Sequence, residues 1–156
     1  IQYLGVEMFY EFLDNLTMLN NLALSHNLDI LVKNHPTIYA YSKILKNLFK
    51  NLTFTNQKIQ KVLNKTNLTI SFSSSVIEDS LYNSNPVILF DRWRRYKHCV
   101  SEMNPKLKNK AVYYINNEKN LVKCINTVFK SKNINFKDYI VKGKSEISIK
   151  KLLSKY

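Results

Sequence analysis

The sequence predicts an α/β protein with a Rossmann-like three-layer fold, in which helices cover both faces of a mostly parallel β-sheet. Short, continuously apolar runs of strand length alternate with longer segments whose apolar residues recur every three or four positions. Strands that are apolar on both sides are typical of parallel sheets buried between helices. Hydrophobic residues make up 45% of the 156 residues, so we expect one domain with its own core over 1–156.

The first half of the chain is expected to be mainly helical. Phe9, Phe12, Leu13 and Leu16 begin a helical apolar pattern, and a short apolar run at 30–32 is stopped by Pro36. The expected elements are a helix over 9–28, a buried strand at 30–32, a helix or helical turn over 38–52, and a helix over 55–66 capped by Thr55 or Asn56.

The second half is expected to contain most of the strands. Runs rich in β-branched and aromatic residues indicate strands, and periodic apolar residues indicate the helices between them. The expected elements are a strand over 67–72, a helix over 74–84, strands over 86–90 and 111–115, and helices over 117–132 and 144–156. Crossovers between the parallel strands should be right-handed.

The charge balance favours an anionic partner. Lys and Arg number 24 against 11 Asp and Glu, a formal net charge of +13. Nucleic acid, a phosphorylated small molecule or an anionic membrane surface would all suit such a chain. Cys99 and Cys124 form no C-x-x-C pair, so we expect reduced thiols, no zinc site and a cytoplasmic protein. No apolar run approaches the roughly 20 residues of a membrane helix, so we expect none. Because the chain begins with Ile1, we expect a fragment of a longer protein.

A serine run follows the strand predicted over 67–72. Ser73, Ser74 and Ser75 open the next helix, where N–H groups, hydroxyls and the helix dipole would suit a phosphate. Glu78 lies about one helical turn further on the same face and could accept hydrogen bonds from a ribose. Simple N-capping and a solvated helix acid are the alternatives for these residues.

Two further polar segments follow predicted strands, and ligands of open α/β sheets bind outside such carboxyl ends. In "KNHP", Lys33 offers a charge, and His35 could donate to a phosphate or act as an acid; a turn histidine packed on proline is the alternative. In "DRWRRYKH", which starts at Asp91, Arg92 and Arg95 lie beside aromatic residues and suit phosphate and base contacts. A solvated basic loop, or a single-stranded nucleic-acid surface, is the alternative there.

Together these segments resemble one family pattern. A "vKxHP" strand end followed by S-S/T-x-x-x-E and a "PVI" strand is similar to the carboxyl-terminal domain of GT-B glycosyltransferases. The matching residues are Lys33, His35, Pro36, Ser73, Ser74, Ser75, Glu78, Pro86, Val87 and Ile88. The nearest groups in pattern are CDP-glycerol glycerophosphotransferases, capsule polysaccharide transferases and bacterial sialyltransferases. The chain departs from them in having "KNHP" for the commoner "KPHP", and Asn85 where Gly usually precedes "PVI".

The resemblance implies a donor-binding half of a GT-B fold in bacterial surface polysaccharide synthesis. In that family the HP histidine and the serines contact the donor phosphate, so His35 would be the catalytic residue and Glu78 would contact ribose. The donor would be CMP-, CDP- or UDP-linked, with no tightly bound cofactor or metal, in keeping with the lack of a D-x-D pair. An amino-terminal domain would supply the base, and the fragment alone should be inactive. A basic surface could also hold the enzyme at the inner membrane face near a lipid-linked acceptor.

Three alternatives remain open from the sequence. UDP-N-acetylglucosamine 2-epimerases have a similar serine turn and "PV" strand, but usually show "SGG" and "EE" where this chain has "SSS" and "ED". A basic nucleic-acid-binding module would explain the charge, but not why polar motifs follow three strands. A flavodoxin- or receiver-like module ranks last, because no acidic cluster for Mg²⁺ is evident.

Overall fold

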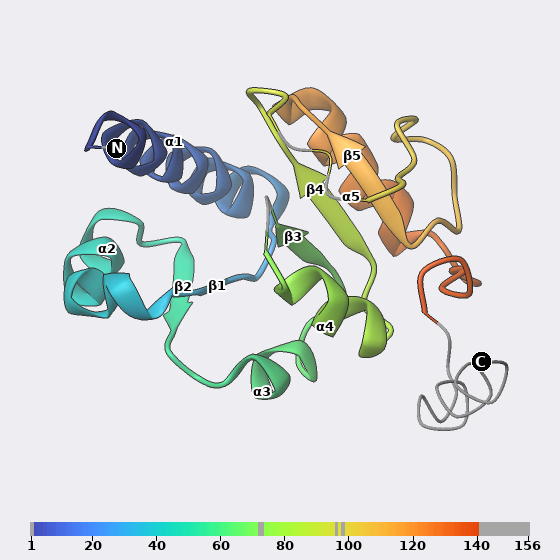
Figure 1. Ribbon diagram of the computed structural model, residues 1–156, viewed down its shortest axis with the longest axis horizontal. Coiled ribbons are helices and arrows are strands. Elements are labelled where there is room, and N and C mark those ends of the chain that lie inside the picture. The colour runs from blue at the N-terminus through green and yellow to red at the C-terminus, as the bar shows by residue number, and fades with distance from the viewer. Residues whose placement is uncertain (1, 72–73, 96, 98, 141–156) are drawn as a thin grey trace, which may run out of the picture. The chain divides into compact units, whose positions relative to one another are not determined.

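The computed structural model describes residues 2–71, 74–95, 97 and 99–140 (Figure 1). The chain divides into two compact units, Ile1–Val62 and Leu63–Tyr156, and each contains a short parallel sheet with helices. The α/β class expected from the sequence is therefore confirmed. Ser73 and the helix expected over 144–156 lie outside the described residues.

The first unit pairs two short strands in parallel, with Ile30 opposite Leu52 and Lys33 opposite Thr55. Its elements are helix α1 (Gln2–His26), strand β1 (Ile30–Lys33), the 3-10 helix η1 (Pro36–Tyr41), helix α2 (Ser42–Leu48) and strand β2 (Leu52–Thr55), and helix α3 (Ile59–Leu63) lies at the boundary between the units. The helix predicted over 9–28 and the strand predicted at 30–32 are confirmed by α1 and β1.

Strand β2 corrects the prediction of a helix running to residue 52. Leu45, Phe49 and Leu52 are spaced three and four apart, which extends the helical pattern of α2. The helix ends at Leu48, however, and the backbone of Phe49 leaves helical geometry with φ −115° and ψ 73°. From Leu52 onward, burial alternates with a period of two, so that Leu52 and Phe54 face the core from a strand.

The core of the first unit joins α1 to the two strands and α2. Its buried residues come from α1, α2, the turn after α2, and β2, namely Leu16, Ala23, Leu45, Phe49, Leu52 and Phe54. Partly buried residues of α1 and β1 pack against them, namely Phe12, Leu13, Leu19, Ile30 and Val32. Because α1 contributes residues one and two turns apart, its inward face is the apolar stripe expected from the sequence.

The second unit contains a three-stranded parallel sheet with the order β3-β4-β5. Its elements are strand β3 (Thr69–Ser71), helix α4 (Val76–Tyr82), strand β4 (Val87–Phe90), strand β5 (Val112–Ile115) and helix α5 (Glu118–Phe129). Each lies within a segment predicted from the sequence. Since all three strands run the same way, Ser71, Phe90 and Ile115 end at one edge of the sheet, called here the carboxyl edge.

Burial explains why the central strand of this sheet reads as an unbroken apolar run. All four residues of β4 are buried, as is expected where a parallel strand has neighbours on both edges and packing on both faces. Asn117 caps the N-terminus of helix α5, and its side chain accepts a hydrogen bond from the Asn120 N–H at 2.9 Å. Its buried face consists of Leu121, Cys124, Ile125 and Val128.

Candidate functional site

The carboxyl edge of the three-stranded sheet brings together residues from the ends of β4 and β5. Phe90 pairs with Ile115, so the chain continues beyond the sheet as Asp91 beside Asn116. The Asp91 N–H donates to the Ile115 carbonyl at 2.9 Å, which extends the ladder by one bond. The loop from Asp91 to Arg95 therefore starts from a rigid strand end, where ligands of open α/β sheets bind.

Asp91 is fully buried and accepts a hydrogen bond from the Tyr114 hydroxyl, with Oη and Oδ2 2.9 Å apart. Burial raises the pKa of Tyr114, and the hydrogen bond to the Asp91 carboxylate and its negative charge add to this. The positive charge of Arg94 acts in the opposite direction on that pKa. Asp91 was expected to bind substrate; in the structure its carboxylate fixes Tyr114 at the same edge.

Arg94 is the residue of this loop whose side chain is held by the neighbouring strand end. With the Asn116 amide turned so that its oxygen faces the guanidinium, Oδ1 accepts from Arg94 Nε at 2.8 Å and from Nη2 at 3.2 Å. The Arg94 backbone has φ 56°, a left-handed conformation that costs about 1 kcal/mol or more for a non-glycine residue. An exposed arginine in a strained loop at a strand end is an arrangement suited to binding an anion.

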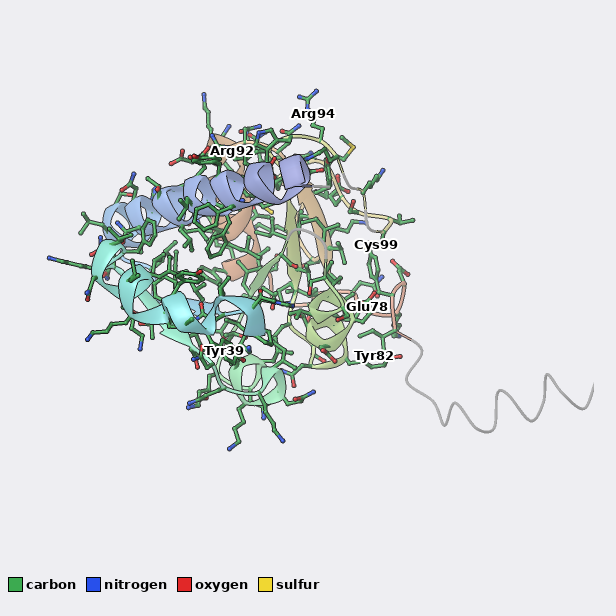
Figure 2. All side chains as sticks on the ribbon, turned by 60° about the vertical axis from the view of Figure 1, so that its left-hand side comes forward. Tyr39, Glu78, Tyr82, Arg92, Arg94 and Cys99 are labelled. Atoms are coloured by element: carbon green, nitrogen blue, oxygen red, sulfur yellow. The ribbon has the colours of Figure 1, made fainter. Side chains whose placement is uncertain are left out.

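Arg92 and Arg95 lie on either side of Trp93 in sequence and approach its ring. Their guanidinium carbons are 5.4 Å and 5.7 Å from the ring centroid, within the range of cation–π attraction. Arg92, Arg94 and Arg95 are all exposed, and Figure 2 shows Arg92 and Arg94 on the same side of the second unit. The loop thus gathers three guanidinium groups and one indole at the carboxyl edge.

The serine turn after β3 differs from the expected phosphate-binding turn. Ser75 is the N-cap of α4, but its side chain makes no capping hydrogen bond. Instead the Ser74 hydroxyl accepts from the Val76 N–H at 3.3 Å, and the Ser74 carbonyl accepts from the Ile77 N–H at 3.1 Å. The expectation that the N–H groups of this turn are free for a phosphate is therefore wrong for Val76 and Ile77, because both donate to oxygens of Ser74. The exposed Ser75 remains accessible to a ligand.

Glu78 is exposed on α4, one turn before Tyr82. Burial is the main cause that raises the pKa of Cys99, and the negative charge of Glu78 raises it further. In Figure 2, Glu78 lies apart from Arg92 and Arg94 and on the side of Cys99. Figure 2 therefore places Glu78 away from Arg92 and Arg94, and a ligand that reached all three side chains would have to extend along the unit.

Lys33 and His35 belong to the first unit, where both follow β1. Lys33 Nζ donates to the Asn34 carbonyl at 2.6 Å and to the Tyr39 hydroxyl at 3.3 Å. His35 is exposed and caps η1, with Nδ1 2.8 Å from Thr37 Oγ1 and accepting from the Thr37 N–H at 3.4 Å. When Nδ1 accepts, the neutral ring carries its proton on Nε2, which is then a donor.

Asn34 is a residue that the sequence interpretation passed over. It is 1% exposed, and its Nδ2 donates to Ser42 Oγ and to Asn56 Oδ1, both at 2.9 Å. These bonds join the segments that follow β1 and β2. The Asn34 N–H also donates to the carbonyl of Thr55, the last residue of β2, at 3.0 Å. Asn34 therefore fixes the backbone that presents His35.

Arg94, Tyr114 and Asn116 were also missed by sequence reasoning. A usable signal was present, because Tyr114 and Asn116 flank the end of a predicted parallel strand, where side chains meet those of the neighbouring strand. Arg94 stood among other basic residues and had no local feature to distinguish it. Its positive φ, which sets it apart, is a property of the folded loop.

Comparisons with known proteins found no relative of this chain, so the proposal of a function rests on the residues of the chain. No protein-family model, no curated protein and no solved structure matches the chain. Within the described part of the chain, no three or more His, Cys, Asp or Glu side chains gather as a metal site would require. Among the helices that can be described, none combines the length and the apolar character needed to cross a membrane.

Proposed function

We propose that the carboxyl edge of the β3-β4-β5 sheet binds the phosphate of a nucleotide-linked donor. The observation that carries this proposal is the Arg94 guanidinium at the end of β4, oriented by Asn116 from the end of β5. Arginine forms paired, charge-assisted hydrogen bonds to phosphate oxygens, and orientation by a neighbour reduces the entropy lost on binding. Arg92 and Arg95 add positive charge at the same loop.

On this proposal the chain is the donor-binding part of a GT-B glycosyltransferase or glycerophosphotransferase that builds bacterial surface polysaccharide. The finer fold, a Rossmann-like three-layer sandwich with one mostly parallel sheet, belongs to the same proposal. The "KNHP" and "SSS" segments support it, since both follow parallel strands. A cytidine or uridine nucleotide is the expected moiety of the donor, with the sugar or glycerol attached through phosphate.

The two departures from the family pattern have structural explanations. Asn34, in place of proline, joins two loops from a buried position. Asn85, in place of glycine, is also buried, and its Nδ2 donates to the Leu63 carbonyl at 2.9 Å and to Thr66 Oγ1 at 3.0 Å. Both asparagines therefore stabilise loops, and neither substitution removes a proposed ligand contact.

In the proposed reaction the chain stabilises charge on the leaving phosphate. Breaking the bond between the transferred group and phosphate leaves negative charge on the phosphate oxygens, which Arg94 and the neighbouring arginines would attract. His35, with its proton on Nε2, offers a hydrogen-bond donor to a phosphate from the end of β1 in the first unit. The roles of Lys33, His35 and the serine turn in donor binding stay predictions.

Thermal unfolding with added nucleotide tests the proposal. CMP, CDP, UMP and UDP are compared with AMP and inorganic phosphate for the chain, for Arg94→Gln, and for the double variant Ser74→Ala with His35→Ala. We expect a pyrimidine nucleotide to raise the unfolding temperature, and both variants to remove the rise. Lys61→Gln, a basic helix residue elsewhere, is the matched control and should keep it.

Several outcomes would contradict the proposal. Protection by no nucleotide would remove its basis, and equal protection by inorganic phosphate would show an anion site without base recognition. Steeply salt-dependent binding to single-stranded oligonucleotide that pyrimidine nucleotides do not compete for would favour a nucleic-acid module. With full-length protein, epimerised UDP-N-acetylglucosamine formed without an acceptor would favour the epimerase alternative.

A further inference from the structure

A second basic surface lies at the other end of the three-stranded sheet. Helix α5 starts beyond the end of β5 and runs back, so its last residue, Phe129, lies toward the edge where the strands begin. The loop before β5 reaches the same edge. In Figure 1 the yellow-orange loop and the red-orange segment after α5 lie together at the right, whereas the loop after β4 is at the upper end of the unit.

Backbone and side-chain bonds join these two segments. Lys110 and Asn135 form a parallel bridge, and the Asn135 N–H donates to the Asn109 carbonyl at 3.0 Å. The Asn109 N–H in turn donates to Ser131 Oγ at 3.1 Å. The segments therefore form one surface whose shape is fixed by the fold of the second unit.

This surface is rich in lysine, and we call it the lysine edge. Its exposed lysines are Lys106, Lys108, Lys110, Lys130, Lys132 and Lys137. The acids on the same segments are fewer: Glu102 Oε1 accepts from the Asn104 N–H at 2.8 Å, and Asp138 Oδ2 accepts from Asn135 Nδ2 at 3.0 Å. With six lysines and two acids, these segments carry a net charge of +4 out of the chain's +13, away from the carboxyl edge.

Large apolar side chains are exposed among these lysines. Leu107 is 43% exposed on the loop before β5, and Phe129 is 54% exposed at the end of α5. Neither belongs to the buried core of the unit. A surface that combines lysines with exposed apolar side chains restricts the possible partners, because the partner must offer both negative charge and an apolar surface.

We propose that the lysine edge docks on an anionic lipid surface. Lysines near such a surface are attracted by its negative potential, and leucine and phenylalanine side chains can enter the boundary between headgroups and acyl chains. A nucleic-acid backbone would satisfy the lysines but would leave Leu107 and Phe129 without an apolar partner. The lysine edge has no arginine, the residue that most often makes directed contacts to bases and phosphates. The inference does not depend on nucleotide binding at the carboxyl edge.

Vesicle co-sedimentation tests the proposal directly. The chain is mixed with vesicles of phosphatidylcholine alone, or with about one third phosphatidylglycerol, at rising salt. We expect binding only to the anionic vesicles. The triple variant Lys106→Glu/Lys108→Glu/Lys132→Glu should weaken it at least about tenfold, and Leu107→Ser with Phe129→Ser about threefold or more at the same salt.

The matched control is Lys58→Glu/Lys61→Glu/Lys65→Glu, which changes the net charge equally at exposed positions elsewhere. It should bind within about twofold of the unchanged chain if the lysine edge is the docking surface. The milder triple Lys→Gln variant of the lysine edge is the second test if charge reversal impairs folding. Equal losses in both triple variants, or no preference for anionic vesicles, would overturn the proposal. So would a lysine-edge variant that keeps vesicle binding but loses oligonucleotide binding.

Discussion

Tyr114, at the end of β5, donates a hydrogen bond to the buried carboxylate of Asp91, at the end of β4, with 2.9 Å between Oη and Oδ2. This bond joins two neighbouring strands just where the chain leaves the sheet. It lies beneath the loop that carries Arg94, so the stability of the sheet and the geometry of the candidate phosphate site depend on the same pair.

Tyr114→Phe removes the hydroxyl and leaves the ring in place. Because a buried carboxylate loses a donor, we expect the free energy of unfolding to fall by about 2 kcal/mol. Urea unfolding measures this. Tyr82→Phe, which removes a hydroxyl from an exposed tyrosine on α4, is the control and should cost less than about 0.5 kcal/mol. Equal losses in the two variants would show that the Asp91–Tyr114 bond is not a stabilising contact.

Arg94→Gly separates folding from binding. Glycine adopts the φ of 56° without the steric cost paid by arginine, so we expect stability to stay within about 1 kcal/mol of the unchanged chain or to rise. Protection by a pyrimidine nucleotide should be lost, because the guanidinium is gone. The same thermal scans measure both effects. A variant that is strongly destabilised, or that keeps full nucleotide protection, would contradict the role given to Arg94.

Asn34→Ala should destabilise the first unit. The change removes both bonds from Nδ2 and leaves a small cavity at a residue that is 1% exposed, for a loss of about 2 kcal/mol. Urea unfolding, followed by circular dichroism, reports it. Asn47→Ala, at an exposed position on α2, is the control and should change little. An Asn34 variant as stable as this control would remove the explanation for asparagine at this position.

Alkaline pH should destabilise the second unit through Cys124. Burial raises the pKa of this thiol from its ordinary value of 9.0 to about 12. A raised pKa in the folded state favours the protonated form, so its contribution to stability is complete below pH 9 and is lost as pH rises toward 12. Urea unfolding at pH 7 to 11 should show a fall in stability that is shallower in Cys124→Ala. An identical slope in both proteins would exclude Cys124 as the cause.

Much of the fold could be predicted because burial follows sequence periodicity in this chain. The apolar run from Val87 to Phe90 is a buried strand, and the residues of α5 that recur at helical spacing face the core. Strand β2 was missed for the same reason, because Leu52 continues the spacing of Leu45 and Phe49. A two-residue period needs several residues to become visible, and β2 has only four.

The site was harder to predict than the fold. Asp91 and the arginine loop were identified because they follow a clear strand, but their partners Tyr114 and Asn116 depend on the register between β4 and β5. The sequence shows where the strand containing Tyr114 ends, but the register, which decides which of its residues lies beside Asp91, is set by packing between the strands. The serine turn was predicted from the sequence, but the partner of Ser74 was not. A serine hydroxyl can accept from a nearby N–H or bind a ligand, and in the structure it accepts from the Val76 N–H.

Amide chemical-shift mapping tests the central claim most directly. A ¹⁵N-labelled chain is titrated with CDP and with UDP while the backbone amides are followed by NMR. The proposed function predicts saturable shifts concentrated at Arg92, Arg94, Arg95, Asn116 and Ser75, with the amides of the lysine edge unchanged. No saturable shifts with either nucleotide, or shifts confined to the lysine edge, would contradict a nucleotide site at the carboxyl edge.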